Sequence, residues 1–227
     1  MKPSVSRDSL TWFGNMTLIE QITVARPAQA EFTEKKSRFI CRLFPVADEE
    51  QAKSLLEQVR AENKGARHNV YAWIIGEQDE FMRSSDDGEP SGTGGRPVLE
   101  SLKQAGLHNV MAVVTRYFGG ILLGASGLTR AYAKAVQLAI DAAQRVVRFP
   151  AAKYAATVDY TYLAKAESLL AAEEVLIEDR VFGEKICLIC AVKDENVSAI
   201  RDKLLKISNG SIRLDDLGEK TWLEKPL

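Results

Sequence analysis

The chain has 227 residues, of which 46% are hydrophobic and 27% are charged. This composition excludes a disordered, collagen-like or disulfide-stapled chain, and the length is sufficient for two domains that each bury a core. The net charge of −1 and the isoelectric point of about 6.2 exclude binding of nucleic acid through an overall basic excess, so such binding would require a local basic patch.

Residues 1–27 are expected to form an N-terminal extension, followed by domains over residues 28–149 and 150–227. Met1–Asn15 is polar and lacks the apolar core of a signal peptide. We expect the extension to be disordered, or partly non-native sequence ahead of Met16. No run of about 18 apolar residues occurs, which excludes a transmembrane helix. The missing signal peptide and the small, odd number of cysteines lead us to expect a cytoplasmic protein.

The predicted N-terminal domain combines strands with amphipathic helices. Asp48 is expected to cap a helix, because Ala52, Leu55, Leu56 and Val59 follow at the i, i+3, i+4, i+7 spacing of one helical face. The patterns predict, in order, extended structure over 31–46, this helix, a strand over 70–75, a long polar loop over 79–97, a short helix over 98–105, a buried strand over 110–115 and a helix over 128–145.

A domain boundary is expected at Arg148–Ala151, a segment that contains Pro150. Beyond it, strands and helices are predicted in the order strand, helix, strand, strand, helix, strand, over residues 153–160, 163–172, 175–182, 185–192, 194–207 and 211–217. This βαββαβ order is that of the ferredoxin-like fold. The sequence therefore predicts an α+β protein of two domains.

The three cysteines, Cys41, Cys187 and Cys190, provide no disulfide framework. Cys187 and Cys190 form a C-x-x-C, a spacing also found in metal and redox sites. They lie in a predicted strand, where residues three apart point to opposite faces, and no second cysteine pair exists to complete a zinc site. We therefore predict that both are buried and bind no metal.

Three stretches have unusual compositions: His68–Trp73, Ser85–Pro97 and Arg116–Leu128. Within them, the strings S-D-D-G-E-P-x-G-T and R-Y-[YF]-G-G-x-x-L-G-x-x-G-L are long and specific. Together with Lys36–Phe39, these strings resemble the IMPACT family and, within it, the YigZ-type proteins of bacteria. The resemblance is strong over residues 32–143, and the C-terminal domain agrees in the order of its elements and in length.

This resemblance implies a fold and a role. The implied fold is a ribosomal-protein-S5-domain-2-like domain followed by a ferredoxin-like domain, a pair similar to domains IV and V of elongation factor G. Eukaryotic members of the family are linked to control of translation, through the activator of the kinase that senses uncharged tRNA. Bacterial members lack the additional partner-binding domain of those proteins. We expect this chain to lack it too, so the kinase pathway is not expected to apply.

The third stretch leads into a predicted helix. Free backbone N–H groups between Gly124 and Gly127, together with the helix dipole, suit an anion. Arg116 can hold a phosphate oxygen, and Tyr117 and Phe118 can stack on a base. Alternatively, the glycines only allow strand and helix to pack closely. The predicted anion- or RNA-binding residues are Arg96, Arg116, Tyr117, Phe118, Gly119, Gly120, Gly124, Ser126 and Gly127.

The second stretch is acidic. Asp86, Asp87 and Glu89, with His68, are candidate ligands for a divalent cation, but we favour a turn in which the Asp side chains accept backbone N–H groups. A Ser–His–Asp triad built from His68, Ser91 and one of the Asp residues lacks a G-x-S-x-G elbow. No catalytic residue, metal or cofactor is therefore predicted.

Three functions fit these patterns. The favoured one is a non-enzymatic protein that binds RNA, the ribosome or a translation factor and modulates translation. The alternatives are a metal-assisted hydrolase, either a peptidase or a phosphoesterase, at the acidic loop, and a small-molecule phosphate binder, by analogy with small-molecule kinases of S5-like fold. The oligomeric state is left open. The favoured function requires a basic groove, for which the candidates are Lys35, Lys36, Arg38, Arg67, Arg96, Arg116 and Arg130.

Overall fold

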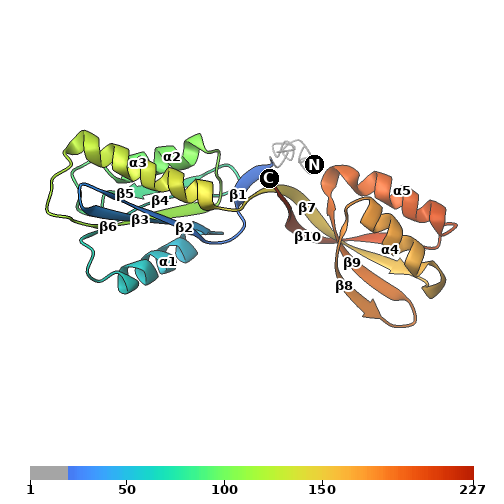
Figure 1. Cartoon of the computed structure of the whole chain (residues 1–227). Coiled ribbons are helices and arrows are strands. Elements are labelled where there is room, and N and C mark those ends of the chain that lie inside the picture. Colours follow the sequence, from blue (N-terminus) through green and yellow to red (C-terminus); the bar gives the residue numbers. More distant parts are fainter. Residues whose placement is uncertain (1–19) are drawn as a thin grey trace, which may run out of the picture.

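The computed structural model describes residues 20–227, which form two α+β domains (Figure 1). In the N-terminal domain, five antiparallel strands make one sheet, in the spatial order β2 (Ala28–Glu34), β3 (Ser37–Pro45), β6 (Val110–Tyr117), β4 (His68–Ile75) and β5 (Phe81–Ser85). Its helices are α1 (Glu49–Glu62), α2 (Gly95–Gln104) and α3 (Ala125–Ala142). None of the helices in the described part of the chain is long and apolar enough to cross a membrane.

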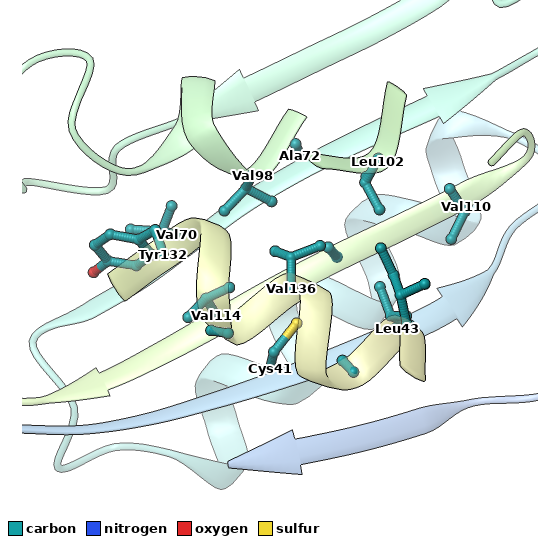
Figure 2. Close-up of a cluster of buried hydrophobic side chains, with 14 of the residues drawn as sticks. Cys41, Leu43, Val70, Ala72, Val98, Leu102, Val110, Val114, Tyr132 and Val136 are labelled. Carbon is teal, nitrogen blue, oxygen red and sulfur yellow. The ribbon is translucent and has the colours of Figure 1, made fainter. Parts of the chain in front are cut away.

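The N-terminal sheet is covered on both faces, with α2 and α3 on one side and α1 on the other (Figure 1). Successive strand residues point to opposite faces, so Val110, Ala112 and Val114 join the core under α2 and α3, while Met111 and Val113 join the core under α1. Figure 2 shows the larger of these cores. Burial on both faces explains why β6 is almost continuously apolar.

The C-terminal domain contains β7 (Arg145–Val158), α4 (Leu163–Ala172), β8 (Leu176–Phe182), β9 (Ile186–Lys193), α5 (Val197–Ile207) and β10 (Arg213–Pro226). Its strands are antiparallel in the order β10-β7-β9-β8. Numbered within the domain, this is the 4-1-3-2 order of the ferredoxin-like fold. The predicted class of two α+β domains is confirmed.

Two predicted boundaries differ from the structure. Strand β1 (Gln21–Val24) lies inside the predicted extension and pairs with the first residues of β7, so this part of the extension belongs to the fold. Burial explains the ordering, because Val24 packs into the core and the Gln21 amide donates to the carbonyls of Gly76 and Glu77, at 3.2 and 3.0 Å. The expected disorder of residues 1–19 concerns a segment outside the described residues.

The second difference is at the domain boundary. Pro150 lies within β7, which is continuous from one domain into the other and pairs with β10 along most of its length. The hydrophobic cores nevertheless remain separate, since the last core residue of the N-terminal domain is Ile140 and the C-terminal core begins at Ala152. The boundary is therefore a shared strand and not a linker.

The cysteines follow the predicted strand geometry only in part. Cys190 is fully buried in the C-terminal core, and burial raises the pKa of its thiol to about 12. Cys187 lies on the opposite face and is only half-buried, so the prediction of burial is wrong for it. The uncovered face of the sheet explains this difference, because α4 and α5 pack on the other face.

Separate cores predict separate responses to mutation. Leu170 is fully buried on α4, so Leu170→Ala should cost about 2–5 kcal/mol. We expect amides of α4 and α5 to exchange hydrogen faster in this variant, with amides of α2 and α3 unchanged. The matched variant Leu43→Ala in β3, also fully buried, should show the reverse pattern. Equal acceleration in both domains would contradict a division near residue 150.

Candidate functional site

A buried ion pair joins the acidic loop to the central strand of the N-terminal sheet. Arg116, near the end of β6, donates from Nη1 to Oε1 of Glu89 at 2.6 Å, and the two side chains are only 6% and 3% exposed. The hydroxyl of Tyr132 on α3 donates to the same oxygen at 2.8 Å. Burial, and then the charge of Glu89, raise the pKa of Tyr132, so this hydroxyl stays a donor.

The guanidinium of Arg116 is fixed from several directions. Its Cζ lies 5.4 Å from the ring centre of Phe39 and 5.6 Å from that of Phe118, within cation–π range. Nη2 donates to Oγ of Ser37 at 3.4 Å. Nε is buried and has no hydrogen-bond partner among the described residues. Arg116 is therefore a rigid part of the domain, and its Nε is left without a partner in the described part of the chain.

Asp86 organises the loop before α2. Its Oδ1 accepts the backbone N–H groups of Gly94 and Gly95 at 2.9 and 2.8 Å, and its Oδ2 accepts that of Gly92 at 2.8 Å. Burial raises the pKa of the Asp86 carboxyl, but the three donors together outweigh it and hold this pKa below its usual value. A Cβ at Gly95 would lie 2.7 Å from backbone atoms of Ser85, so only glycine fits this close approach.

Asp87 ties the same loop to the α1 side of the sheet. Its Oδ1 accepts from Nη2 of Arg60 and its Oδ2 from the backbone N–H of Asn69, both at 2.7 Å. Nδ1 of His68 lies 2.8 Å from the Asp87 carbonyl oxygen, which only accepts, so Nδ1 carries the proton and Nε2 is left free. Asp86 therefore accepts backbone N–H groups within the loop, whereas Asp87 accepts from residues outside it. Acceptance of backbone N–H groups by the Asp side chains is the interpretation favoured from the sequence.

These contacts also bear on the catalytic and metal interpretations. His68 meets a backbone carbonyl and not a carboxylate, and both oxygens of Asp86 are held by backbone donors, so the Ser–His–Asp relay with Ser91 is not assembled. Among residues 20–227, no three His, Cys, Asp or Glu side chains are grouped to hold a metal ion.

A cleft of about 400 Å³ opens between the acidic loop, the end of β6 and the start of α3. Gly124 precedes α3 with a φ of 74°, and no side chain caps this helix. The polar or charged side chains that line the cleft are Arg67, His68, Glu89 and Arg116, and the apolar ones are Pro90, Phe118, Leu122, Leu123, Ala125 and Leu128.

The structure brings together only some of the predicted anion-binding residues. Arg116, Phe118 and Gly124 line the cleft, with His68 and Glu89 from the acidic stretch. Nη1 and Nη2 of Arg116 already donate to Glu89 and Ser37, so the prediction that Arg116 holds a phosphate oxygen now rests on its Nε.

Tyr117 lies away from the other residues of the predicted site. It follows Arg116 in the strand and so points to the other face, where its hydroxyl donates to Oδ1 of Asn63 at 2.8 Å. Arg96 is exposed in the first turn of α2 and does not line the cleft.

The remaining predicted residues have different surroundings. Gly119 donates its N–H to Oγ of Ser37, and a Cβ there would lie 2.0 Å from the carbonyl carbon of Lys36, so this glycine is required for close packing. Gly120 and Ser126 are exposed beside the cleft without lining it. Gly127 lines a neighbouring hollow of about 300 Å³, with Phe32, Glu34, Lys35, Leu123, Arg130, Ala131 and Lys134.

Sequence reasoning missed Tyr132, Leu122 and Leu123 as site residues. The helical periodicity places Tyr132 only in the apolar stripe of α3. A hydroxyl within such a stripe is a signal, since a buried tyrosine usually finds a hydrogen-bond partner. The sequence pattern does not predict that Leu122 is 81% exposed.

The buried pair yields a matched stability test. Glu89→Gln should cost about 3–5 kcal/mol, because it leaves the Arg116 charge buried without its counter-ion. Glu31→Gln removes the partner of Arg38 from an ion pair of the same 2.6 Å length whose side chains are about half exposed, and should cost less than about 1 kcal/mol. Urea unfolding measures both, and similar losses would contradict the role given to burial.

Asp86 should show a pH signature. Its pKa is lower in the folded state, so the stability it supplies is fully present above the unfolded-state pKa of about 4 and is lost as pH falls through the lower folded value. Asp86→Asn should therefore cost about 1–2 kcal/mol at pH 7, with the difference shrinking in acid. Urea unfolding across pH, with the exposed Asp215→Asn as control, tests this, and a pH-independent difference would contradict it.

Comparisons with known proteins agree with this architecture. Residues 35–140 match the Impact N-terminal domain, and residues 157–211 match a domain of unknown function, DUF1949. The "IMPACT family member YvyE" of Bacillus subtilis (strain 168) is 38% identical over 203 residues, covering 89% of this chain and 93% of that protein. The "IMPACT family member YigZ" of Escherichia coli (strain K12) is 38% identical over 182 residues, covering 79% and 89%.

One solved structure, described as a hypothetical protein, aligns with a TM-score of 0.59 at 35% identity, covering 86% of this chain and 96% of that one. The human "Protein IMPACT" is 36% identical over 96 residues, which are 40% of this chain and 30% of that protein. Identity across nearly the full length of the bacterial relatives shows that the chain belongs to the IMPACT family.

Proposed function

We propose that the protein is a non-enzymatic regulator of translation that binds RNA of the translation apparatus through the end of its N-terminal domain. Membership of the IMPACT family supports the assignment to translation, since the eukaryotic members are linked to its control. RNA, and not a ribosomal protein or a translation factor, is the partner that the charges at this end of the domain favour.

The observation that carries the proposal is a group of free cations around the start of α3. Lys35, Lys36, Arg67, Arg130 and Lys134 are all exposed, and none forms an ion pair with a described residue. Arg67 lines the cleft, and Lys35, Arg130 and Lys134 line the neighbouring hollow; both spaces include Leu123, so these four cations lie on one continuous surface. Lys36 lines neither space, but it follows Lys35 in the turn between β2 and β3. We call these five residues the cationic rim.

Neighbouring acidic groups offset this rim only in part. Glu34 lines the neighbouring hollow and forms no ion pair with a described residue. Asp87 and Glu89 are paired with arginines, and Asp86 is held by three backbone donors. Their charges are therefore offset locally, and the rim cations determine the sign of the surface potential within about a Debye length, ~8–10 Å. This explains how a chain of net charge −1 can present a phosphate-binding surface.

The surface is smaller than the groove that the sequence suggested. Arg38 is engaged by Glu31, Arg116 is buried, and Arg96 lies outside both hollows. Lys134, which was not among the candidates, joins the rim and also lies over the ring of Phe32 at 4.6 Å. With about five phosphate contacts, binding should be moderate in strength and strongly dependent on salt.

RNA binding by the rim has a quantitative signature. Lys35→Ala and Arg130→Ala should each reduce the slope of log affinity against log salt by about one unit, with similar losses for different RNA sequences, because phosphate contacts carry no base information. Lys206→Ala is the matched control, since Lys206 is an exposed cation on α5 without an ion pair in the described chain. Fluorescence anisotropy with labelled single-stranded RNA measures these values.

If the wild-type protein binds no RNA at low salt, or if the rim variants behave like Lys206→Ala, the rim does not bind RNA. Circular dichroism checks that each variant is folded.

A further inference from the structure

We infer that the cleft between the acidic loop and α3 is a site for one nucleoside monophosphate unit, with its phosphate at the N-terminus of α3 and its base against Phe118. The unit is either a free nucleotide or one residue of a single-stranded RNA. The second source rests on the proposed function, whereas the first does not.

The phosphate end of the site is the start of α3. This helix has 18 residues, begins at Ala125, and carries no side-chain cap, so its first backbone N–H groups are open to an acceptor. Ala125 and Gly124 both line the cleft. The positive end of the helix dipole therefore faces a space that a ligand can enter, which favours an anion there.

A second and independent observation also calls for an acceptor. Arg116 lines the cleft with a side chain that is only 6% exposed, and its Nε is buried without a hydrogen-bond partner among residues 20–227. An unsatisfied buried donor on a charged group is rare and costly in native proteins. A ligand oxygen in the cleft would satisfy it without disturbing the bond from Arg116 to Glu89.

The carboxylate of Glu89 also lines the cleft, and by itself it would repel a phosphate. Its Oε1 is occupied by Arg116 and Tyr132, so the pair contributes little net charge. Arg67, exposed at the mouth of the cleft, adds an uncompensated positive charge. Together with the helix N-terminus, the charge of Arg67 makes the net electrostatic interaction in the cleft favourable for an anion.

The other end of the cleft suits a planar apolar group. Phe118 is 46% exposed and Leu122 is 81% exposed, which is unusual for two large apolar side chains at one opening. An exposed aromatic ring beside a phosphate site is the arrangement on which single-stranded bases stack. The volume of about 400 Å³ lies within the range of small-molecule sites.

The test uses the full chain and simple probes. We would follow backbone amides by NMR while adding uridine monophosphate, uridine, inorganic phosphate or a short acidic peptide. Uridine monophosphate should shift the amides of Ala125, Ser126 and Phe118, and should bind about tenfold or more tightly than uridine, which lacks the charge. Inorganic phosphate should shift the α3 amides only, and more weakly.

One substitution blocks the site without harming the fold. Ala125→Asp places a carboxylate in the first turn of α3, where it stabilises the helix but repels a phosphate. It should weaken binding of uridine monophosphate about tenfold or more. Ala199→Asp is the matched control, because Ala199 is exposed in the first turn of α5, and it should bind as wild type. Phe118→Leu should reduce the preference for the nucleotide over inorganic phosphate.

The outcomes separate this inference from the proposed function. If single-stranded RNA binds but uridine monophosphate does not shift the cleft amides, the inference fails and the proposed function stands. If uridine monophosphate binds and RNA does not, the cleft is a free-nucleotide site and the proposed function fails. Equal binding of inorganic phosphate or of the acidic peptide, or equal behaviour of Ala125→Asp and Ala199→Asp, would overturn the inference.

Discussion

The ion pair between Arg116 and Glu89 is the interaction on which the rest of the site depends. Its atoms come from β6 and from the acidic loop, and Tyr132 adds a donor from α3. Two buried charges are stable only while each has its partner and further hydrogen bonds. The pair therefore fixes a loop that has almost no apolar side chains to bury. With that loop in place, Asp86 can hold the backbone at the start of α2.

This arrangement divides the charges at the end of the N-terminal domain into two classes. Fixed charges, such as those of Arg116 and Asp87, are paired in ion pairs that hold the loop to the sheet. Free charges, such as those of Lys35, Arg67 and Arg130, remain in solvent. The net charge of the chain combines both classes, so the whole-chain value of −1 conceals a cationic surface.

Local patterns predicted the features that depend on neighbours in sequence. The Asp48 cap and the βαββαβ order both arise from short-range periodicity, and both occur in the structure. The features that the sequence did not predict depend on pairing between segments far apart in the chain. β1 is a strand because β7 provides an edge for it, and β5 is an exposed edge strand with few buried side chains, so neither has a strong local signal. The placement of Tyr117 was predictable in principle, but only once the strand was known to extend through it, because adjacent strand residues diverge.

The same division of charges constrains how any ligand of the cleft must be held. Arg116 cannot turn toward a ligand without leaving Glu89 uncompensated, at a cost of about 3–5 kcal/mol, which exceeds the value of a typical hydrogen bond. A bound anion must therefore rely on groups that the fold does not need: the N–H groups of α3, the Nε of Arg116 and the cationic rim. The first two are rigid and set position, whereas the rim side chains are solvated and adjustable. A surface of this kind fixes one group of a ligand while tolerating variation in the groups attached to it, which is the combination that the proposed binding of RNA without sequence preference requires.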